Sequence, residues 1–170
     1  NLLHLRNGEG IYQPEGLPHA YLEGQNVEVM ANSDNVLRAG LTNKHIDVAE
    51  LMKHVIFEAT VPQVITALET HHQQYKTPAK EFELHRYFFA GEKSWETTGP
   101  EIVLVLRGQL TLAHGEYWDN LMEGEALFIK ARATITATAG QQVLFFRVAM
   151  GMSIRRLLLR ERISPRLLSS

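Results

Sequence analysis

Short apolar runs separated by turn residues fill most of the second half of the chain, a pattern typical of β structure. Residues 102–106 and 143–148 are almost wholly apolar, and no helical period long enough for a crossover separates such runs. Strands at this spacing, joined by glycine-containing turns, predict a sandwich or small barrel. The expected strands cover residues 81–89, 102–106, 109–113, 126–129, 134–138 and 143–148.

The first part of the chain predicts short β-elements broken by turns. Residues 7–10 and 14–16 are turn sequences, because Pro presets φ and Gly tolerates positive φ. Alternation over residues 27–31 predicts a strand that is buried on both faces or nearly so. A helix is expected over residues 47–55, with Asp47 as its N-cap.

These patterns divide the chain into four parts. Residues 1–60 form a first β unit with the helix, 61–80 a connector with about one helical turn, and 81–150 a second β unit. Residues 151–170 form a basic tail with five arginines. A basic amphipathic helix can bind a membrane or a partner, but a chain end that packs a few leucines locally is the simpler explanation.

Composition narrows the classes of function. The 170 residues carry a formal net charge of -2, which gives no bulk electrostatic case for binding nucleic acid or an anionic membrane. The chain has no cysteine, so a thiolate nucleophile, an iron–sulfur cluster and a Cys-ligated zinc site are excluded. No apolar run reaches the roughly 18 residues of a membrane-spanning helix. We expect a cytoplasmic protein, since an absence of cysteine fits a reducing compartment.

The candidate chemistry begins at a glycine-rich hairpin. Gly8, Pro14, Gly16 and His19 have the spacing G-x5-P-x-G-x2-H. A strand, a tight turn and a second strand would deliver one imidazole to a barrel interior, because register decides which face a side chain occupies. This spacing is the second motif of the cupin superfamily, in which the histidine binds a metal. From the spacing alone, a metal ligand and an ordinary core or rim histidine explain His19 equally well.

A longer motif makes the resemblance specific. The sequence PHAYL at residues 18–22, followed by EVMANSDNVLRAGLTNK at residues 28–44, closely resembles type I mannose-6-phosphate isomerases. The resemblance is strong over about residues 3–58, rests on strand pattern alone over residues 81–150, and does not cover the tail. It implies a mainly β fold: part of a cupin (jelly-roll-like) barrel, a short helix, and a second, degenerate cupin-like β domain.

The resemblance also implies a cofactor and an activity. In that family, a zinc ion is held by a Gln, two His and a Glu, and His19 matches the last of these ligands. The other ligands are expected upstream, so the chain resembles the C-terminal portion of an enzyme that interconverts mannose 6-phosphate and fructose 6-phosphate through an enediol. The expected partners are the sugar phosphate and the missing N-terminal part, and the isolated chain is expected to be inactive.

Five further residues are assigned roles by the same resemblance. Arg38 would stabilise the developing oxyanion, and Glu28 would act as base or bind sugar hydroxyls. Asp34 would orient a cation or assist proton transfer, Tyr21 would contact the sugar, and Lys44 would assist with the phosphate or with charge balance. Structural alternatives stay open: Arg38 could form a simple ion pair with Asp34 or Glu28, and Asp34 could belong only to an Asx turn.

The second β unit lacks the corresponding chemistry. Neither residues 95–101 nor residues 124–134 contain a histidine where a cupin ligand would fall, so a structural role is expected, with His85 and His114 as ordinary histidines. Two alternatives to an isomerase are a non-catalytic cupin that binds sugars or regulates, and an iron oxygenase, which would need two histidines and a carboxylate. Unpaired strand edges would also allow dimerisation.

Overall fold

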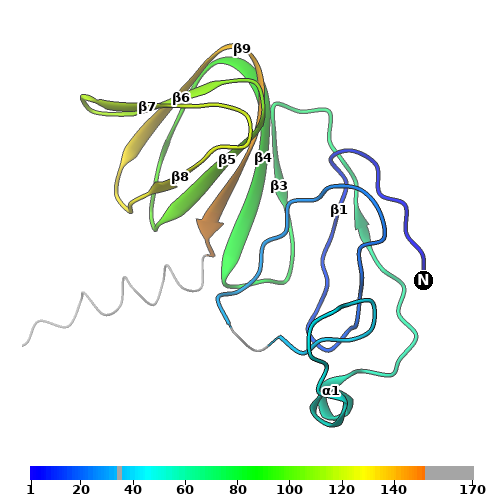
Figure 1. Ribbon diagram of the computed structural model, residues 1–170. Coiled ribbons are helices and arrows are strands. Elements are labelled where there is room, and N and C mark those ends of the chain that lie inside the picture. The colour runs from blue at the N-terminus through cyan, green and yellow to red at the C-terminus, as the bar shows by residue number, and fades with distance from the viewer. Residues whose placement is uncertain (34–35, 152–170) are drawn as a thin grey trace, which may run out of the picture. The chain divides into compact units, whose positions relative to one another are not determined.

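The computed structural model describes residues 1–33 and 36–151. Asp34 and nearly all of the predicted basic tail therefore lie outside the described residues. The chain divides into two compact units, Asn1–Ala67 and Leu68–Ser170. Antiparallel β structure dominates, and the prediction of a mainly β fold is confirmed (Figure 1). None of the helices in the described part is long and apolar enough to cross a membrane.

The second unit is one antiparallel sheet of seven strands. Strands β3, β4, β9, β5 and β8 follow one another in the sheet, and β6 pairs with both β7 and β9. β4 and β9 run side by side over most of their length (Figure 1). The strands are β3 (His72–Tyr75), β4 (Phe82–Glu96), β5 (Glu101–Arg107), β6 (Leu110–His114), β7 (Tyr117–Leu121), β8 (Ala126–Ile129) and β9 (Thr134–Met150).

The core of this unit comes from alternate residues of its strands. Val103 and Val105 on β5 and Val143 and Phe145 on β9 are completely buried, while Ile102, directly before Val103, is exposed. The rings of Phe145 and Tyr87 stack with centroids 4.8 Å apart. Burying each such side chain contributes about 1.5–3 kcal/mol. The alternation therefore places these apolar side chains on one face of the sheet, where they form the core.

Several predicted boundaries in this unit are wrong. The two strands expected over residues 134–138 and 143–148 form the single strand β9, because β4 pairs along nearly its whole length. β4 itself extends to Glu96, past a register shift at Gly91, whose φ is 98°. The connector expected over residues 61–80 contains short strands and, in the part that the structure describes, no helical turn.

The first unit has little regular structure. Strand β1 (Gly10–Ile11) pairs with β2 (Val64–Ile65), and helix α1 spans Val48–His54. The predicted helix and its cap are confirmed, since Oδ1 of Asp47 accepts a hydrogen bond from the Glu50 backbone N–H at 2.9 Å. The strand predicted before the turn is limited to β1, and the strands predicted over residues 27–31 and at His19 do not form among the described residues. A strand needs a hydrogen-bonded neighbour, and none lies beside these segments.

The turn before His19 forms as predicted. Gly16 adopts a φ of 79°, and its carbonyl accepts a hydrogen bond from the Ile56 N–H at 2.9 Å. A Cβ at this position would lie 3.0 Å from the Ile56 side chain. Glycine is therefore suited to the site in two ways: it adopts the left-handed backbone without strain, and it lets the segment after α1 approach the turn.

Candidate functional site

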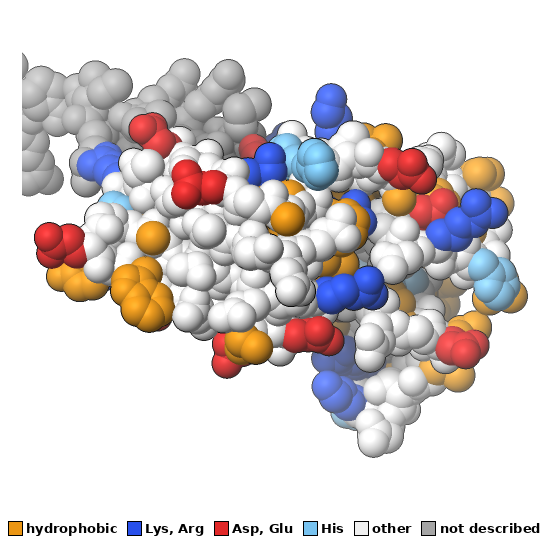
Figure 2. Space-filling view, turned by 90° about the horizontal axis from the view of Figure 1, so that it is seen from above, with side chains coloured by type: hydrophobic (Ala, Val, Ile, Leu, Met, Phe, Trp, Pro, Cys, Tyr) orange, Lys and Arg blue, Asp and Glu red, His pale blue; other side chains and the backbone are white. Residues whose placement is uncertain are grey.

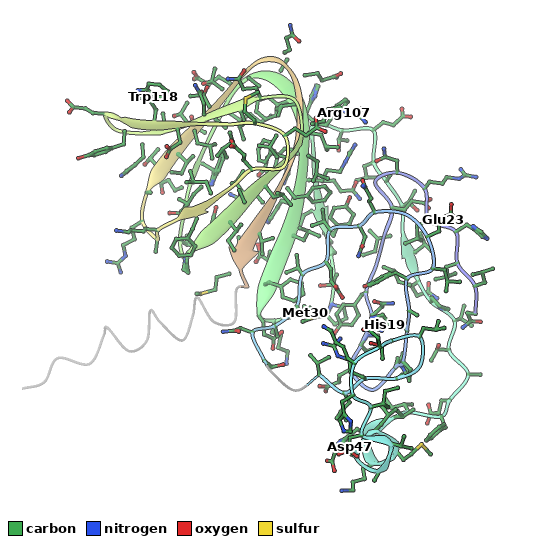
Figure 3. The ribbon with its side chains drawn as sticks, viewed as in Figure 1. His19, Glu23, Met30, Asp47, Arg107 and Trp118 are labelled. Atoms are coloured by element: carbon green, nitrogen blue, oxygen red, sulfur yellow. The ribbon has the colours of Figure 1, made fainter. Side chains whose placement is uncertain are left out.

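His19 lies in the loop that follows the Gly16 turn (Figure 3). Its side chain is exposed, and Nδ1 lies 3.1 Å from the backbone oxygen of Leu17. A carbonyl beside Nδ1 favours the tautomer in which this nitrogen carries the proton. Nε2 then keeps its lone pair, which is the arrangement typical of a histidine that binds a metal.

Two of the other predicted residues gather around this imidazole. The rings of Tyr21 and His19 meet edge to face, with centroids 5.8 Å apart. The Tyr21 hydroxyl donates a hydrogen bond to Oε1 of Glu28 at 3.0 Å and lies 3.4 Å from Oε1 of Gln13. These contacts bring His19, Tyr21 and Glu28 together without the strand pairing that the sequence predicted.

The hydroxyl of Tyr21 stays protonated in this setting. Partial burial raises the pKa of Tyr21, and the hydrogen bond to Glu28 and the charge of that carboxylate raise it further. A neutral phenol donates a proton in a hydrogen bond, so the pair combines a donor with a carboxylate acceptor. This combination suits the recognition of hydroxyl groups.

Arg38 and Lys44 make no hydrogen bond or ion pair with that group in the part of the chain that the structure describes. Arg38 is exposed, and among the described residues no hydrogen bond or ion pair joins it to Glu28. The structural ion pair with Glu28, an alternative explanation of Arg38, is therefore not seen. Lys44 is also exposed, and its backbone N–H donates to Oγ1 of Thr42 at 3.2 Å. Asp34 lies outside the described residues.

The described residues fit zinc only in part. No group of three or more His, Asp or Glu side chains that could hold a metal occurs in residues 1–33 or 36–151. A catalytic zinc site needs about three protein ligands. His19 is suited by its tautomer to supply one such ligand through Nε2.

Sequence reasoning missed a buried polar cluster in the second unit. Nε1 of Trp95 donates to Oε2 of Glu101 at 3.0 Å, and Nη1 of Arg147 lies 3.5 Å from the same oxygen. The Arg147 guanidinium also lies 5.3 Å from the Trp95 ring centroid and 5.8 Å from that of Tyr87. An arginine inside the apolar run 143–148 was the available signal, because a charge within a buried strand requires a partner.

Comparison with known proteins identifies relatives of the chain. No protein-family model matches it. Mannose-6-phosphate isomerase 1 of Arabidopsis thaliana is 31% identical over 155 residues, which cover 88% of this chain and 36% of that protein. The Escherichia coli K12 mannose-6-phosphate isomerase is 35% identical over 144 residues, covering 82% of this chain and 37% of that protein. The resemblance to mannose-6-phosphate isomerases is confirmed.

A solved structure agrees with this resemblance. The crystal structure of the Salmonella typhimurium mannose-6-phosphate isomerase, bound to its substrate fructose 6-phosphate and to zinc, matches with a TM-score of 0.59 and 30% identity. The match covers 72% of this chain and 32% of that enzyme. The chain thus spans about a third of the length of the mannose-6-phosphate isomerases that it matches.

Proposed function

We propose that this chain forms part of a zinc-dependent isomerase that interconverts mannose 6-phosphate and fructose 6-phosphate. The observation that carries the proposal is the 35% identity to the E. coli mannose-6-phosphate isomerase over 82% of the chain. The contacts among His19, Tyr21 and Glu28 support it, because they combine a histidine suited to a metal with groups suited to a sugar.

The reaction moves a proton between C1 and C2 of the sugar through an enediol. Glu28 is the candidate base, since its carboxylate is exposed and can accept a proton. The neutral hydroxyl of Tyr21 would hold that carboxylate in place and exchange its hydrogen bond for one to a sugar hydroxyl. Zinc, when bound, would polarise the sugar oxygens as a Lewis acid.

Cationic side chains have separate roles in this proposal. Arg38 keeps its charge at any pH of interest and offers a planar fork of donors, so it would stabilise the negative charge that develops on the enediolate. Lys44 would attract the phosphate, and Asp34 would orient one of these cations. His19 would contribute one zinc ligand through Nε2.

The first test concerns the isolated chain. Because a single ligand cannot hold zinc in a catalytic site, we expect the 170-residue chain to bind zinc weakly and to show no isomerase activity. Zinc content after dialysis and turnover of mannose 6-phosphate measure these outcomes. Stoichiometric zinc with turnover that EDTA abolishes would contradict the proposal that the chain supplies only part of the site.

The second test concerns the activity itself. In a longer protein that contains this chain together with the remaining ligands, Arg38→Ala should lower kcat by about a hundredfold while zinc content stays unchanged. Arg6→Ala is a matched control, because Arg6 is an exposed arginine outside the motif. If that longer protein bound sugar phosphates but converted none of them, the alternative of a non-catalytic sugar-binding module would replace the isomerase.

A further inference from the structure

The second unit has a groove that the proposed isomerase chemistry does not use. It has a volume of about 390 Å³, within the range typical of small-ligand sites, and lies between the β6–β7 hairpin and β8. β8 lies below that hairpin in the view of Figure 1. Leu112, Leu127 and Ile135 line the groove and belong to or pack against the core of the unit. Its floor is therefore apolar and held by the packed sheet.

The loop between β8 and β9 forms one side of the groove and is held firmly. Thr97, which is 2% exposed, donates from Oγ1 to the Lys130 carbonyl and accepts from the Ala133 N–H, both at 2.9 Å. The Arg132 N–H donates to the Thr97 carbonyl at 2.8 Å, and the Thr97 N–H donates to the Ala133 carbonyl at 2.9 Å. Four hydrogen bonds thus fix this loop through one buried threonine.

Arg132 has an unusual backbone within this loop. Its φ is 64°, a left-handed conformation that few residues other than glycine adopt. Such strain persists only where the surroundings impose it, and it often accompanies a binding function. The Thr97 hydrogen bonds impose it here, and they hold an arginine at a position where glycine would be less strained.

The charges that line the groove favour an anion. Lys130 and Arg132 are both exposed, and in the described part of the chain neither forms an ion pair. Asp119 is the carboxylate among the lining residues, and Nδ1 of His114 donates to the Thr134 carbonyl, 3.0 Å away. Two neighbouring cations above an apolar floor suit a ligand with a doubly charged group and a ring.

The ring would meet aromatic side chains at the same groove. Tyr117, Trp118 and Phe128 line it and are 82%, 65% and 63% exposed. Aromatic side chains offer broad surfaces on which a flat ring can stack. We propose that this groove binds a small organic phosphate with a flat ring, the phosphate lying at Lys130 and Arg132 and the ring over the apolar floor, against these aromatic side chains.

Phenyl phosphate is a suitable probe, because it combines both features of the expected ligand. Titration of the full chain, followed by NMR shifts of backbone amides, should move resonances of β6, β8 and the 130–133 loop. Inorganic phosphate and phenol, tested alone, should each bind at least about tenfold more weakly than phenyl phosphate. If phenyl phosphate left these amides unmoved, or if phenol bound as tightly, the proposal would be overturned.

Arg132→Gly separates binding from folding. Glycine accepts a φ of 64°, so this variant should fold at least as stably as the parent chain while it loses the cation. We expect phenyl phosphate to bind about tenfold more weakly, the loss typical of one charge-assisted contact. Arg107→Ala is the control, since Arg107 lies far from Trp118 in this unit (Figure 3). Undiminished binding by Arg132→Gly would contradict the proposal.

All residues of this groove lie in the second unit, so the inference does not depend on the isomerase proposal. A chain that binds phenyl phosphate but contributes to no isomerase would support the groove alone. A longer protein that has isomerase activity, in which phenyl phosphate shifts none of the groove amides, would support only the proposed function.

Discussion

The two units differ in how they are stabilised. In the second unit, Val103, Val105, Leu110, Val143 and Phe145 form a core from which solvent is fully excluded. In the first unit, none of the described residues is buried, and large hydrophobic side chains such as Phe57 and Val61 are 72% and 82% exposed. Figure 2 shows hydrophobic side chains at the surface among charged ones.

The two units are therefore stabilised by different kinds of interaction. The second unit is stabilised by the burial of apolar area, whereas the first depends on a few separate interactions: a helix cap, tight turns and a two-residue strand pair. Single hydrogen bonds and caps contribute about 1 kcal/mol each, so they are weaker than a packed core. Substitutions of the same kind should therefore have unequal effects in the two units.

The largest expected difference between the two units comes from removing one phenylalanine ring from each of them. Phe145→Ala should lower the free energy of unfolding of the second unit by about 3–5 kcal/mol, because it leaves a cavity in the core. Phe57→Ala should change the stability of the first unit by less than about 0.5 kcal/mol, since that side chain is exposed. Urea unfolding followed by tryptophan fluorescence reports on the second unit, which contains both Trp95 and Trp118.

A measurement on the first unit can also contradict this comparison. Amide hydrogen exchange would report on the first unit, which contains no tryptophan. If Phe57→Ala accelerated exchange throughout the first unit as strongly as Phe145→Ala does in the second, Phe57 would have to be part of a core. The contrast between the two units would then be wrong.

A smaller effect is expected at the helix cap of the first unit. Asp47→Ala removes the acceptor of the Glu50 N–H and should destabilise α1 by about 1 kcal/mol. Exchange of the Leu51 amide, which bonds to the Asp47 carbonyl, should become about fivefold faster. Asp47→Ser keeps a capping oxygen and is the control. An unchanged exchange rate in Asp47→Ala would show that the cap contributes nothing.

The smallest expected effect is a dependence of the second unit on pH. Burial lowers the pKa of His72 below 6.5, and the positive charges of Arg147 and Lys93 lower it further. His72 also stacks on Tyr87, with centroids 4.4 Å apart, and its Nε2 lies 3.0 Å from Nδ1 of His85. Because the unfolded chain binds the proton more readily than the folded one, stability should fall as the pH falls below about 6.5.

His72→Gln identifies the source of that dependence. The thermal midpoint of the parent chain should decrease between pH 7 and pH 5, and the variant should lose less over the same interval. The effect is expected to be small, since the imidazole is only partly buried and solvent screens its charge. Equal losses in the two proteins would assign the dependence to other groups.

Sequence patterns predicted the second unit better than the first. Apolar runs predicted β5, β6 and β8 correctly, because strands that pack on a core carry apolar side chains at the buried positions. β7 was missed because four of its five residues are exposed, and β3 because its residues are mostly polar. In the first unit, the pattern over residues 27–31 predicted a strand that does not form, since alternation cannot supply the neighbouring strand that pairing requires.

The candidate site was predicted by motif rather than by geometry. The sequence predicted His19 on a strand, whereas the structure brings its ring and that of Tyr21 together in a loop. The hydrogen bond from Tyr21 to Glu28 was not predicted, because it depends on how residues 22–27 turn between them. The polar cluster of Arg147 and Glu101 depends on pairing between distant strands, which local sequence does not specify.

The hydrogen bond between Ile56 and Gly16 couples two distant parts of the first unit. It fastens the turn that leads into the loop of His19 to the segment that leaves α1, about thirty residues further along the chain. Damage to that helix would therefore loosen the loop that carries His19 without altering any atom of the imidazole itself.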